Sequence, residues 1–341
     1  MKIKREDLMA VLLAVRPGLA KKDIVEQATH FIFTGKDVVT YNDHICISHP
    51  LETAFKGSVE ADKFYKILSG IKDERISLKA DGNKLMVDSS KTRSALSMIP
   101  AGKINEYIDK LSLRTVTKSL KQNRVPSDFI GGLFLCMFSA SRDLTHGPLA
   151  GVFVSGKNIY SSDDLRISRY EMKVKISEKM LLPAQSVMEL VKFPVIYFFL
   201  APKSGWAHFG TKNGVVFSCR LMKDDYPDPS KFFATEGRKV TLPKETQAAV
   251  KAVSIMTEGI VDADRRVELR VGDGKLTLRG EQEIGWVERD VELKYKGKSF
   301  KTQINPTFLF QVLDKSTTVT IGENKALFES GTFQHVMKLP K

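Results

Sequence analysis

Three stretches of the chain share one order of hydrophobic and polar positions, an amphipathic helix followed at once by a strand. They are residues 59–78 (VEADKFYKILSGIKDERISL), 182–200 (LPAQSVMELVKFPVIYFFL) and 304–321 (INPTFLFQVLDKSTTVTI), which recur at a spacing of roughly 120 residues. In the first stretch, apolar residues recur every three or four positions between Val59 and Ile71, with charged residues between them. This spacing predicts a helix with one apolar stripe and one charged face.

The polar residues around these helices predict where the helices begin. Glu60 and Asp62 are placed in the first turn of the first helix, where the helix dipole favours anions. Asn305 is the expected N-cap of the third helix, and Pro306 is its expected first residue. Alternating strands follow each helix; they are expected at 75–80, 85–90 and 94–99, at 195–200, 207–211 and 215–221, and at 317–321, 326–330 and 335–339.

A second helix and further strands precede each of these stretches. The leading helices are predicted at 5–15, 127–140 and 244–256, and the strands that follow them at 37–49, 158–172 and 275–293. The chain therefore divides into three units of helix, strands, helix and strands, with breaks near 113–120 and 236–240. Domains of the α+β class resemble one another by chance, but three matches in the same order favour an internal repeat.

The leading helix of the middle unit, DFIGGLFLCMFSAS, is apolar on nearly every side. It contains Gly131 and Gly132, each of which costs helix stability of about 1 kcal/mol relative to alanine. One interpretation is a fully buried helix. The alternative is a helix that packs closely against a neighbour through its glycines. Any basic surface in this region would have to come from the flanking residues Lys121, Arg124 and Arg142.

Composition places the chain among globular proteins of two or three domains. It has 341 residues, with 42% hydrophobic and 27% charged residues. No apolar run reaches the roughly 18–20 residues of a membrane helix. We expect no signal peptide, because Asp7 precedes the apolar stretch and no small-residue cleavage site follows it. The three cysteines, Cys46, Cys136 and Cys219, lie far apart in apolar surroundings, which predicts buried thiols in a reducing cytoplasm.

Charge supplies the first functional indication. The formal net charge is +13, which favours polyanionic partners and long-range attraction toward them. The sequence contains no P-loop, HExxH or GxSxG motif, and its six histidines lack the spacing of metal ligands. VGDGKLTLRG predicts a hairpin turn at Asp273-Gly274 rather than a phosphate-binding loop. We therefore expect a protein without catalytic activity, cofactor or metal.

Three segments resemble motifs of a known family. In NIYSSDDLRIS, residues 158–168, a strand ends in a polar turn; MKDDYPDPSKF, residues 222–232, contains an aromatic-Pro-Asp sequence; and FQHVMKLPK forms a hydrophobic C-terminal tail. In this order, the segments resemble those of the bacterial-type DNA sliding clamp, the β subunit of DNA polymerase III. The resemblance covers essentially the whole chain. It implies three DNA-clamp domains, at 1–115, 116–238 and 239–341, with helices lining a pore and antiparallel sheets outside.

The chain also departs from the family pattern. Asp164-Leu165 replaces the Gly-His pair of the turn, Pro229 replaces an aromatic residue, and Lys338 replaces a proline. Family members are often acidic, whereas this chain is basic. A divergent clamp encoded by a phage or another mobile element would fit these departures.

The resemblance implies a non-catalytic processivity factor, a homodimeric ring that encircles double-stranded DNA. A ring needs only a diffuse positive lining, because attraction to phosphates is independent of sequence and permits sliding. For any single cation, a solvated surface charge is an equally good interpretation. The expected DNA-binding residues are Arg5, Lys21, Lys22, Lys63, Lys66, Arg142, Lys192, Lys244, Lys251 and Lys315.

The resemblance also implies a hydrophobic pocket that binds short peptides of DNA polymerase and clamp loader. Its expected residues are Leu149, Ser162, Asp164, Leu165, Arg166, Ile167, Pro227, Lys231, Phe232, Val336 and Met337. The ring interface is expected to join the first domain of one chain to the third domain of another, by strand pairing and a small apolar cluster. Its expected residues are Lys72, Glu74, Ile255 and Met256, with Asp73 nearby. The alternative to a clamp is a basic nucleic-acid-binding protein that does not encircle DNA.

Overall fold

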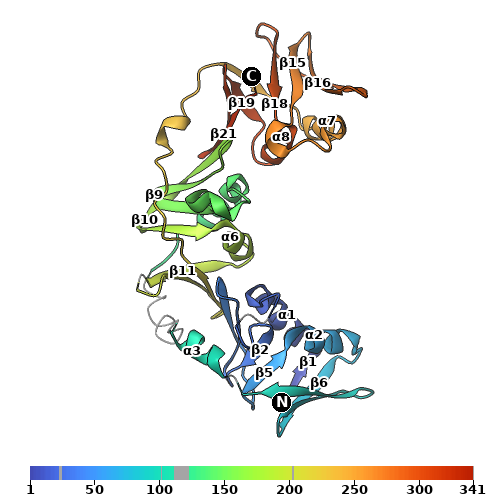
Figure 1. Ribbon diagram of the computed structural model, residues 1–341, viewed down its shortest axis with the longest axis vertical. Helices are drawn as coiled ribbons and strands as arrows, with labels where there is room; N and C mark the ends of the chain where they lie inside the picture. The colour runs from blue at the N-terminus through green and yellow to red at the C-terminus, as the bar shows by residue number, and fades with distance from the viewer. Residues whose placement is uncertain (23–24, 101, 111–122, 202, 341) are drawn as a thin grey trace. The chain divides into compact units, whose positions relative to one another are not determined.

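The computed structural model describes residues 1–22, 25–100, 102–110, 123–201 and 203–340, without the side chains of residues 103, 107 and 110. The chain forms two compact units. Unit 1 comprises Met1–Ile130 and Gln185–Lys223, and unit 2 comprises Gly131–Ala184 and Asp224–Lys341 (Figure 1). The expected division into three domains stays a prediction, and its first boundary, at residues 115 and 116, lies outside the described residues.

Unit 1 contains an 11-stranded sheet of order β1-β6-β7-β8-β5-β2-β3-β4-β13-β12-β11. Its pairs are antiparallel, and pairing of β4 with β13 joins the N-terminal strands to the three strands that follow residue 194. The strands are β1 Lys2–Lys4, β2 His30–Phe33, β3 Asp37–Tyr41, β4 Ile45–Pro50, β5 Gly57–Glu60, β6 Arg75–Asp81, β7 Lys84–Asp88, β8 Arg93–Ile99, β11 Val195–Ala201, β12 Trp206–Thr211 and β13 Val216–Arg220.

Unit 2 contains two antiparallel sheets. The six-stranded sheet has the order β14-β19-β20-β21-β10-β9, and the four-stranded sheet has the order β17-β16-β15-β18. The strands are β9 Gly151–Ser162, β10 Arg166–Pro183, β14 Arg238–Thr241, β15 Val267–Gly272, β16 Lys275–Gln282, β17 Gly285–Glu292, β18 Phe300–Ile304, β19 Thr318–Ile321, β20 Lys325–Ser330 and β21 Phe333–Lys338.

The helices are short and cover these sheets. They are α1 Arg5–Val15, α2 Ala61–Gly70, α3 Lys103–Lys110, α5 Phe129–Cys136, α6 Ala184–Leu190, α7 Thr246–Val253 and α8 Pro306–Leu313. In unit 1, α1 and α2 lie side by side, and in unit 2, α7 and α8 do so (Figure 1). None of the helices in the described part of the chain is long and apolar enough to span a membrane.

The predicted helix starts are confirmed at α8 and corrected at α2. The Asn305 side chain caps α8 and accepts a hydrogen bond from the Phe308 amide at 3.1 Å, with Pro306 as the first helical residue. Glu60 is the N-cap of α2 rather than part of its first turn, and its carboxylate accepts the amides of residues 62 and 63. Val59, predicted on the apolar stripe of that helix, lies in β5 and pairs with Phe31 of β2.

The predicted strand at 158–172 is much longer in the structure. Strands β9 and β10 form one long hairpin, and β10 continues to Pro183. The sequence concealed this extension because exposed charged residues occupy several of its positions and its register shifts between Glu171, Ile176 and Met180. The hairpin predicted at Asp273-Gly274 is confirmed, and both residues have the positive φ that this tight turn requires.

The middle leading helix is shorter than predicted and is not fully buried. It ends at Cys136, and a 3-10 turn, Met137–Ser139, follows. Phe134 is 52% exposed, whereas Leu133 and Cys136 are buried. A Cβ atom on Gly132 would lie 2.5 Å from the Tyr170 ring, so this glycine permits close packing against β10. The alternative of a glycine-mediated contact is therefore confirmed for Gly132 and not for Gly131, which faces open space.

Two imidazoles are buried in the sheets. His335 of β21 is hydrogen-bonded through Nδ1 to the Ser168 hydroxyl at 2.9 Å, and His208 of β12 to the Ser218 hydroxyl at 2.8 Å. Burial lowers the pKa of His208 to about 4 and that of His335 well below its usual 6.5. Both side chains are therefore neutral in the folded protein at neutral pH. The three cysteines are free and buried, as predicted.

The two adjacent glycines of α5 provide a matched pair of substitutions. Gly132→Ala is expected to lower the free energy of unfolding by about 1–3 kcal/mol, because the new methyl group overlaps Tyr170 and Ile159. Gly131→Ala is expected to raise it by up to about 1 kcal/mol, because alanine favours the helix and meets no neighbour. Urea unfolding followed by circular dichroism measures both, and equal midpoints for the two variants would contradict the assigned contact.

The buried imidazoles predict a loss of stability in mild acid. Below pH 6.5 the unfolded chain binds protons at His208 and His335 that the folded chain excludes, so the free energy of unfolding falls as the pH decreases. The expected slope is about 1.4 kcal/mol per pH unit for each imidazole, down to the folded-state pKa. Denaturant midpoints measured from pH 7 to pH 5 test this, and constant midpoints would contradict neutral burial.

Candidate functional site

The cations predicted to bind DNA in unit 1 differ in their exposure to solvent and in whether they form ion pairs. Lys63 and Lys66 are exposed on α2, and Lys21 and Lys22 are exposed after the 3-10 turn that follows α1; these four form no ion pair within the described residues. Lys192 is exposed but pairs with Glu189 at 2.7 Å. Arg5 is only 20% exposed in its side chain, and its guanidinium contacts Glu6 and the Met9 sulfur.

Unit 1 contains a further cation on the α1–α2 side that the sequence did not single out. Arg16 follows α1, pairs with Asp62 at 3.2 Å and lies 5.4 Å from the Tyr65 ring centroid. Asp62 and Tyr65 both belong to α2. Arg16 therefore links the end of α1 to α2 while remaining half exposed.

In unit 2, the predicted cations separate into exposed and half-buried ones. Arg142, Lys244 and Lys251 are exposed, the last on α7. Lys315 is half-buried, and its Nζ lies 4.5 Å from the Phe138 ring centroid and 5.7 Å from that of Phe134. Burial lowers its pKa below the usual lysine value. Lys315 thus contacts aromatic rings of its own chain, which makes it the least accessible of the predicted DNA contacts in this unit.

The turn between β9 and β10 is built around one carboxylate. Asp163 accepts hydrogen bonds from the amides of Leu165 and Arg166, both at 2.9 Å, and pairs with the Arg166 guanidinium at 3.0 Å. The Ser162 hydroxyl donates to the carbonyl of Arg166 at 2.9 Å. These bonds fix the turn and leave Asp164 exposed, with His146 at 3.8 Å from its carboxylate.

Three segments far apart in the sequence converge beside this turn. Their buried side chains form an apolar cluster, here called the 160–336 cluster, composed of Tyr160, Ile167, Phe233, Leu327 and Val336. Phe153 and Tyr226 pack against it with their rings stacked at 5.0 Å. The convergence was predicted, but Phe153, Tyr226 and Phe233 were not among the predicted residues. The aromatic-Pro-Asp motif that begins at Tyr226 could have indicated one of them.

One hydroxyl in this region lacks an internal partner. Tyr226 Oη is buried and forms no hydrogen bond with the residues the structure describes. Burial, with smaller contributions from Cys136 and Asp163, raises the tyrosine pKa above its usual value. The phenol is therefore neutral and leaves one hydrogen-bond donor unused beside the 160–336 cluster.

The predicted pocket residues do not all lie on one face of the sheet. Ile167 and Val336 are cross-strand partners in the 160–336 cluster. Arg166 and Met337 are the adjacent partners, so their side chains point to the opposite face. Met337 is fully buried in the main core of unit 2, against which Leu165 also packs.

Arg166 is buried on that opposite face rather than exposed to a partner. Its side chain is 5% exposed, and its guanidinium lies 4.2 Å from the Phe308 ring centroid and 5.4 Å from that of Phe138. It also donates to the Gln311 amide oxygen. The predicted pocket residues that remain at the surface or half-buried are Leu149, Ser162, Asp164, Leu165, Pro227, Lys231 and Phe232, of which Phe232 is 55% exposed.

Each unit also has a strand edge that is open within the described residues. In unit 1, Arg93–Ser97 of β8 pair only with β7, since β5 reaches only Met98 and Ile99. In unit 2, β17 is a terminal strand of its sheet. Ile255 is 60% exposed on the 3-10 turn that contacts β17, and Met256 is half-buried beside Gly280 of β16.

The other predicted interface residues, 72–74, directly precede β6 in unit 1. Lys72 and Glu74 are exposed, and Glu74 pairs with Lys4 at 3.7 Å. Asp73 accepts a hydrogen bond from the Ser90 hydroxyl, which precedes β8. No cluster of three or more potential metal ligands occurs among the described residues.

Comparison with known proteins gives a consistent result. No family model matches the chain. The β sliding clamp of Pseudomonas putida KT2440 is 23% identical over 317 residues, which cover 89% of this chain and 84% of that protein. The DNA polymerase β subunit of Streptococcus pyogenes matches the structure with a TM-score of 0.81 and 17% identity, covering 100% of this chain and 99% of that one.

A second solved structure agrees. The Helicobacter pylori β clamp, bound to a DNA ligase peptide, matches with a TM-score of 0.80 and 17% identity, covering 100% of this chain and 99% of that one. The match over the full length confirms the predicted fold class, in which short helices and antiparallel sheets repeat along the chain. The chain is therefore similar in sequence to a bacterial β sliding clamp and shares the fold of DNA polymerase III β subunits.

Proposed function

We propose that the protein is a DNA polymerase processivity factor, a non-catalytic subunit that forms a homodimeric ring around double-stranded DNA in the cytoplasm. The observation that carries this proposal is the fold match over the full length to the Streptococcus pyogenes β subunit. The sequence match to the Pseudomonas putida sliding clamp supports it independently. We further propose three clamp domains per chain, at 1–115, 116–238 and 239–341.

The free cations suit a protein that slides. Topological retention removes the need for tight contacts, so the DNA-facing surface needs only a diffuse positive field. Lys63 and Lys66 on α2 and Lys251 on α7 are exposed lysines without internal partners in the described structure. Their long, flexible side chains can follow phosphates without fixing a register. Among the predicted contacts, these three are the strongest candidates, together with Lys21 and Lys22.

Two of the open strand edges, in β8 and β17, support closure of the ring. An antiparallel edge has free amides and carbonyls that can continue a sheet into another chain. We propose that Arg93–Ser97 of one copy pair with β17 of a second copy. Ile255 and Met256 would supply the apolar contact beside that pairing.

The surface around the 160–336 cluster supports a dock for partner peptides. It combines apolar and aromatic side chains with the unused Tyr226 hydroxyl, which matches the composition of a peptide site. The Helicobacter pylori clamp was solved with a DNA ligase peptide. By likeness to it, we propose that polymerase and clamp-loader peptides bind this chain at Phe232, Pro227 and the turn of residues 162–165.

Retention on DNA tests the ring directly. Protein loaded onto nicked circular duplex DNA is expected to stay bound through gel filtration at high salt and to dissociate once the circle is cut to a linear form. Topology holds a ring on a circle even when salt screens the phosphates. Binding that survives linearisation, or that disappears equally from circles and linear DNA with salt, would support the non-encircling alternative.

Two exposed aliphatic residues of unit 2 test the interface. Ile255→Arg is expected to weaken dimerisation by about tenfold or more, because an unpaired charge in an apolar contact loses its hydration, and a loss of about 1.4 kcal/mol already corresponds to tenfold. Val261→Arg, at a side chain 70% exposed, is the control and should leave the dimer unchanged. Sedimentation velocity measures both, and equal effects would remove Ile255 from the interface.

Substitution of Phe232 and Met337 separates peptide binding from stability. Phe232→Ala is expected to weaken binding of the DNA ligase peptide by about fivefold to thirtyfold, the effect of losing an exposed aromatic anchor. Met337→Ala is expected to lower the free energy of unfolding by about 2–5 kcal/mol, because Met337 is a core residue. Val174→Ala, at a side chain 60% exposed on β10, is the control. Unchanged peptide affinity in Phe232→Ala would refute the assignment.

A further inference from the structure

A basic loop connects β17 to β18 in unit 2. The loop and the first two residues of β18, residues 293–301, have the sequence LKYKGKSFK, and Lys294, Lys296, Lys298 and Lys301 are all exposed. None of the four forms an ion pair within the described residues. By contrast, most cations of the adjoining strands are paired with acids: Arg270 with Glu268 and Glu288, Lys275 with Asp290, and Arg279 with Glu281. Arg289 of β17 is the exception within the described residues, so most unpaired cations of this sheet lie in or next to the loop.

Aromatic packing gives the loop a fixed shape. The Tyr295 and Phe300 rings meet edge to face at 6.0 Å, and both pack against the main core of unit 2. Gly297 is in close contact with the Tyr295 ring, so that a Cβ atom there would overlap the phenol. The lysines thus project from a segment whose alternate residues are anchored, which lowers the entropy cost of presenting them to a ligand.

The loop forms one wall of a cavity of about 980 Å³. Lys294, Tyr295 and Lys296 line it on this side, and Leu242 and Pro243 line it on the other. Among the described residues that line the cavity, Glu292 is the one acidic residue. The cavity therefore combines two free ammonium groups with an aromatic ring and an apolar surface.

We propose that this loop and cavity bind a single-stranded segment of nucleic acid. The lysines contact phosphates as point charges, and a base occupies the space between Tyr295 and Pro243. Proteins that bind single strands combine a positive groove with aromatic surfaces for the bases in this manner. A paired base inside a duplex is not available to enter such a cavity, so an unpaired strand fits better.

An acidic peptide is the competing occupant. Carboxylates favour the bidentate geometry of arginine, whereas all four cations of this loop are lysines. Extended peptides also bind through backbone hydrogen bonds, and Pro243 in the wall has no backbone N–H to donate. The proposed site lies outside the helices and the peptide surface described above, and it does not depend on closure of the ring.

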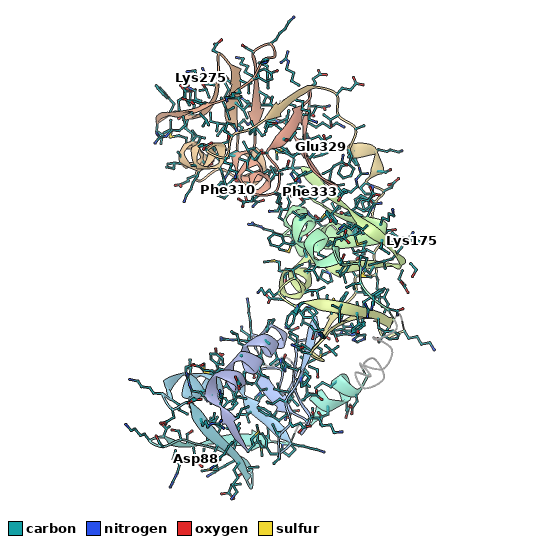
Figure 2. All side chains as sticks on the ribbon, turned by 180° about the vertical axis from the view of Figure 1, so that it is seen from behind. Asp88, Lys175, Lys275, Phe310, Glu329 and Phe333 are labelled. Atoms are coloured by element: carbon teal, nitrogen blue, oxygen red, sulfur yellow. The ribbon has the colours of Figure 1, made fainter. Side chains whose placement is uncertain are left out.

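A matched pair of charge variants of the full chain tests the proposal. In the first, Lys294, Lys296 and Lys298 are replaced by Glu. In the second, Lys157, Lys175 and Lys179, exposed residues of β9 and β10, are replaced by Glu, which lowers the net charge equally. Lys175 lies well apart from Lys275, which adjoins Gly274 of the cavity wall (Figure 2). Fluorescence anisotropy with a labelled deoxythymidine oligonucleotide measures the affinity over a range of salt concentrations.

The loop variant is expected to bind the oligonucleotide about tenfold more weakly, and the slope of log K against log salt to fall by about 0.7 for each lost phosphate contact. The control variant should keep the wild-type affinity. Equal losses in the two variants would show a general charge effect, and unchanged affinity would remove the site; either overturns the proposal. Loss of binding to a poly-glutamate peptide, with oligonucleotide binding intact, would assign the loop to acidic peptides instead. Retention of the loop variant on circular duplex DNA distinguishes failure of this site from failure of the ring.

Discussion

Antiparallel pairing between strands far apart in the sequence is the constraint on which both units depend. In unit 1, β4 pairs with β13, and in unit 2, β10 pairs with β21. Each pairing joins strands that lie far apart in the sequence into one continuous sheet. The β10–β21 register also positions the candidate peptide surface, because it places Ile167 opposite Val336 and fixes the turn held by Asp163. A slip of one residue would exchange the two faces of the sheet and remove the 160–336 cluster.

Buried polar groups make this pairing specific. The Ser139 and Ser168 hydroxyls and the His335 imidazole form a hydrogen-bonded group with no exposure to solvent. The Phe138 ring lies 5.0 Å from that imidazole. These hydrogen bonds form only when the strands align correctly. A wrong register would leave further donors and acceptors unpaired, at a cost of about 1–3 kcal/mol each, in addition to His335 Nε2, which is buried without a partner in the described structure. Apolar packing alone would tolerate more than one alignment.

The sequence predicted those parts of the fold that depend on local chemistry. The N-cap at Asn305, the turn at Asp273-Gly274 and most hairpins after the second helices depend on residues close together in the chain. It failed where distant pairing decides the outcome. Val59 fits a helical stripe by spacing but pairs with Phe31, and the exposed charges of β10 concealed its length. Predicted pocket residues such as Val336 and Met337 were grouped as neighbours in sequence, whereas strand alternation places them on opposite faces.

The cations show the same limit of prediction from sequence. The sequence gives their number, but it does not show which of them lack contacts with acids or aromatic rings of the same chain. Arg166 and Lys315 add to the net charge of +13, yet both are held against aromatic rings of their own chain. A cation over a ring is stabilised by the quadrupole of the ring and by burial of its aliphatic stem, so moving it onto a phosphate would sacrifice both. Lysines such as Lys63, Lys251 and Lys296 lose no such contact when DNA approaches. The positive electrostatic field that nucleic acid meets therefore comes from the unpaired lysines. Some of these lysines lie on helix faces, which suits a weak and mobile contact, and others lie in one loop, which suits a more local contact.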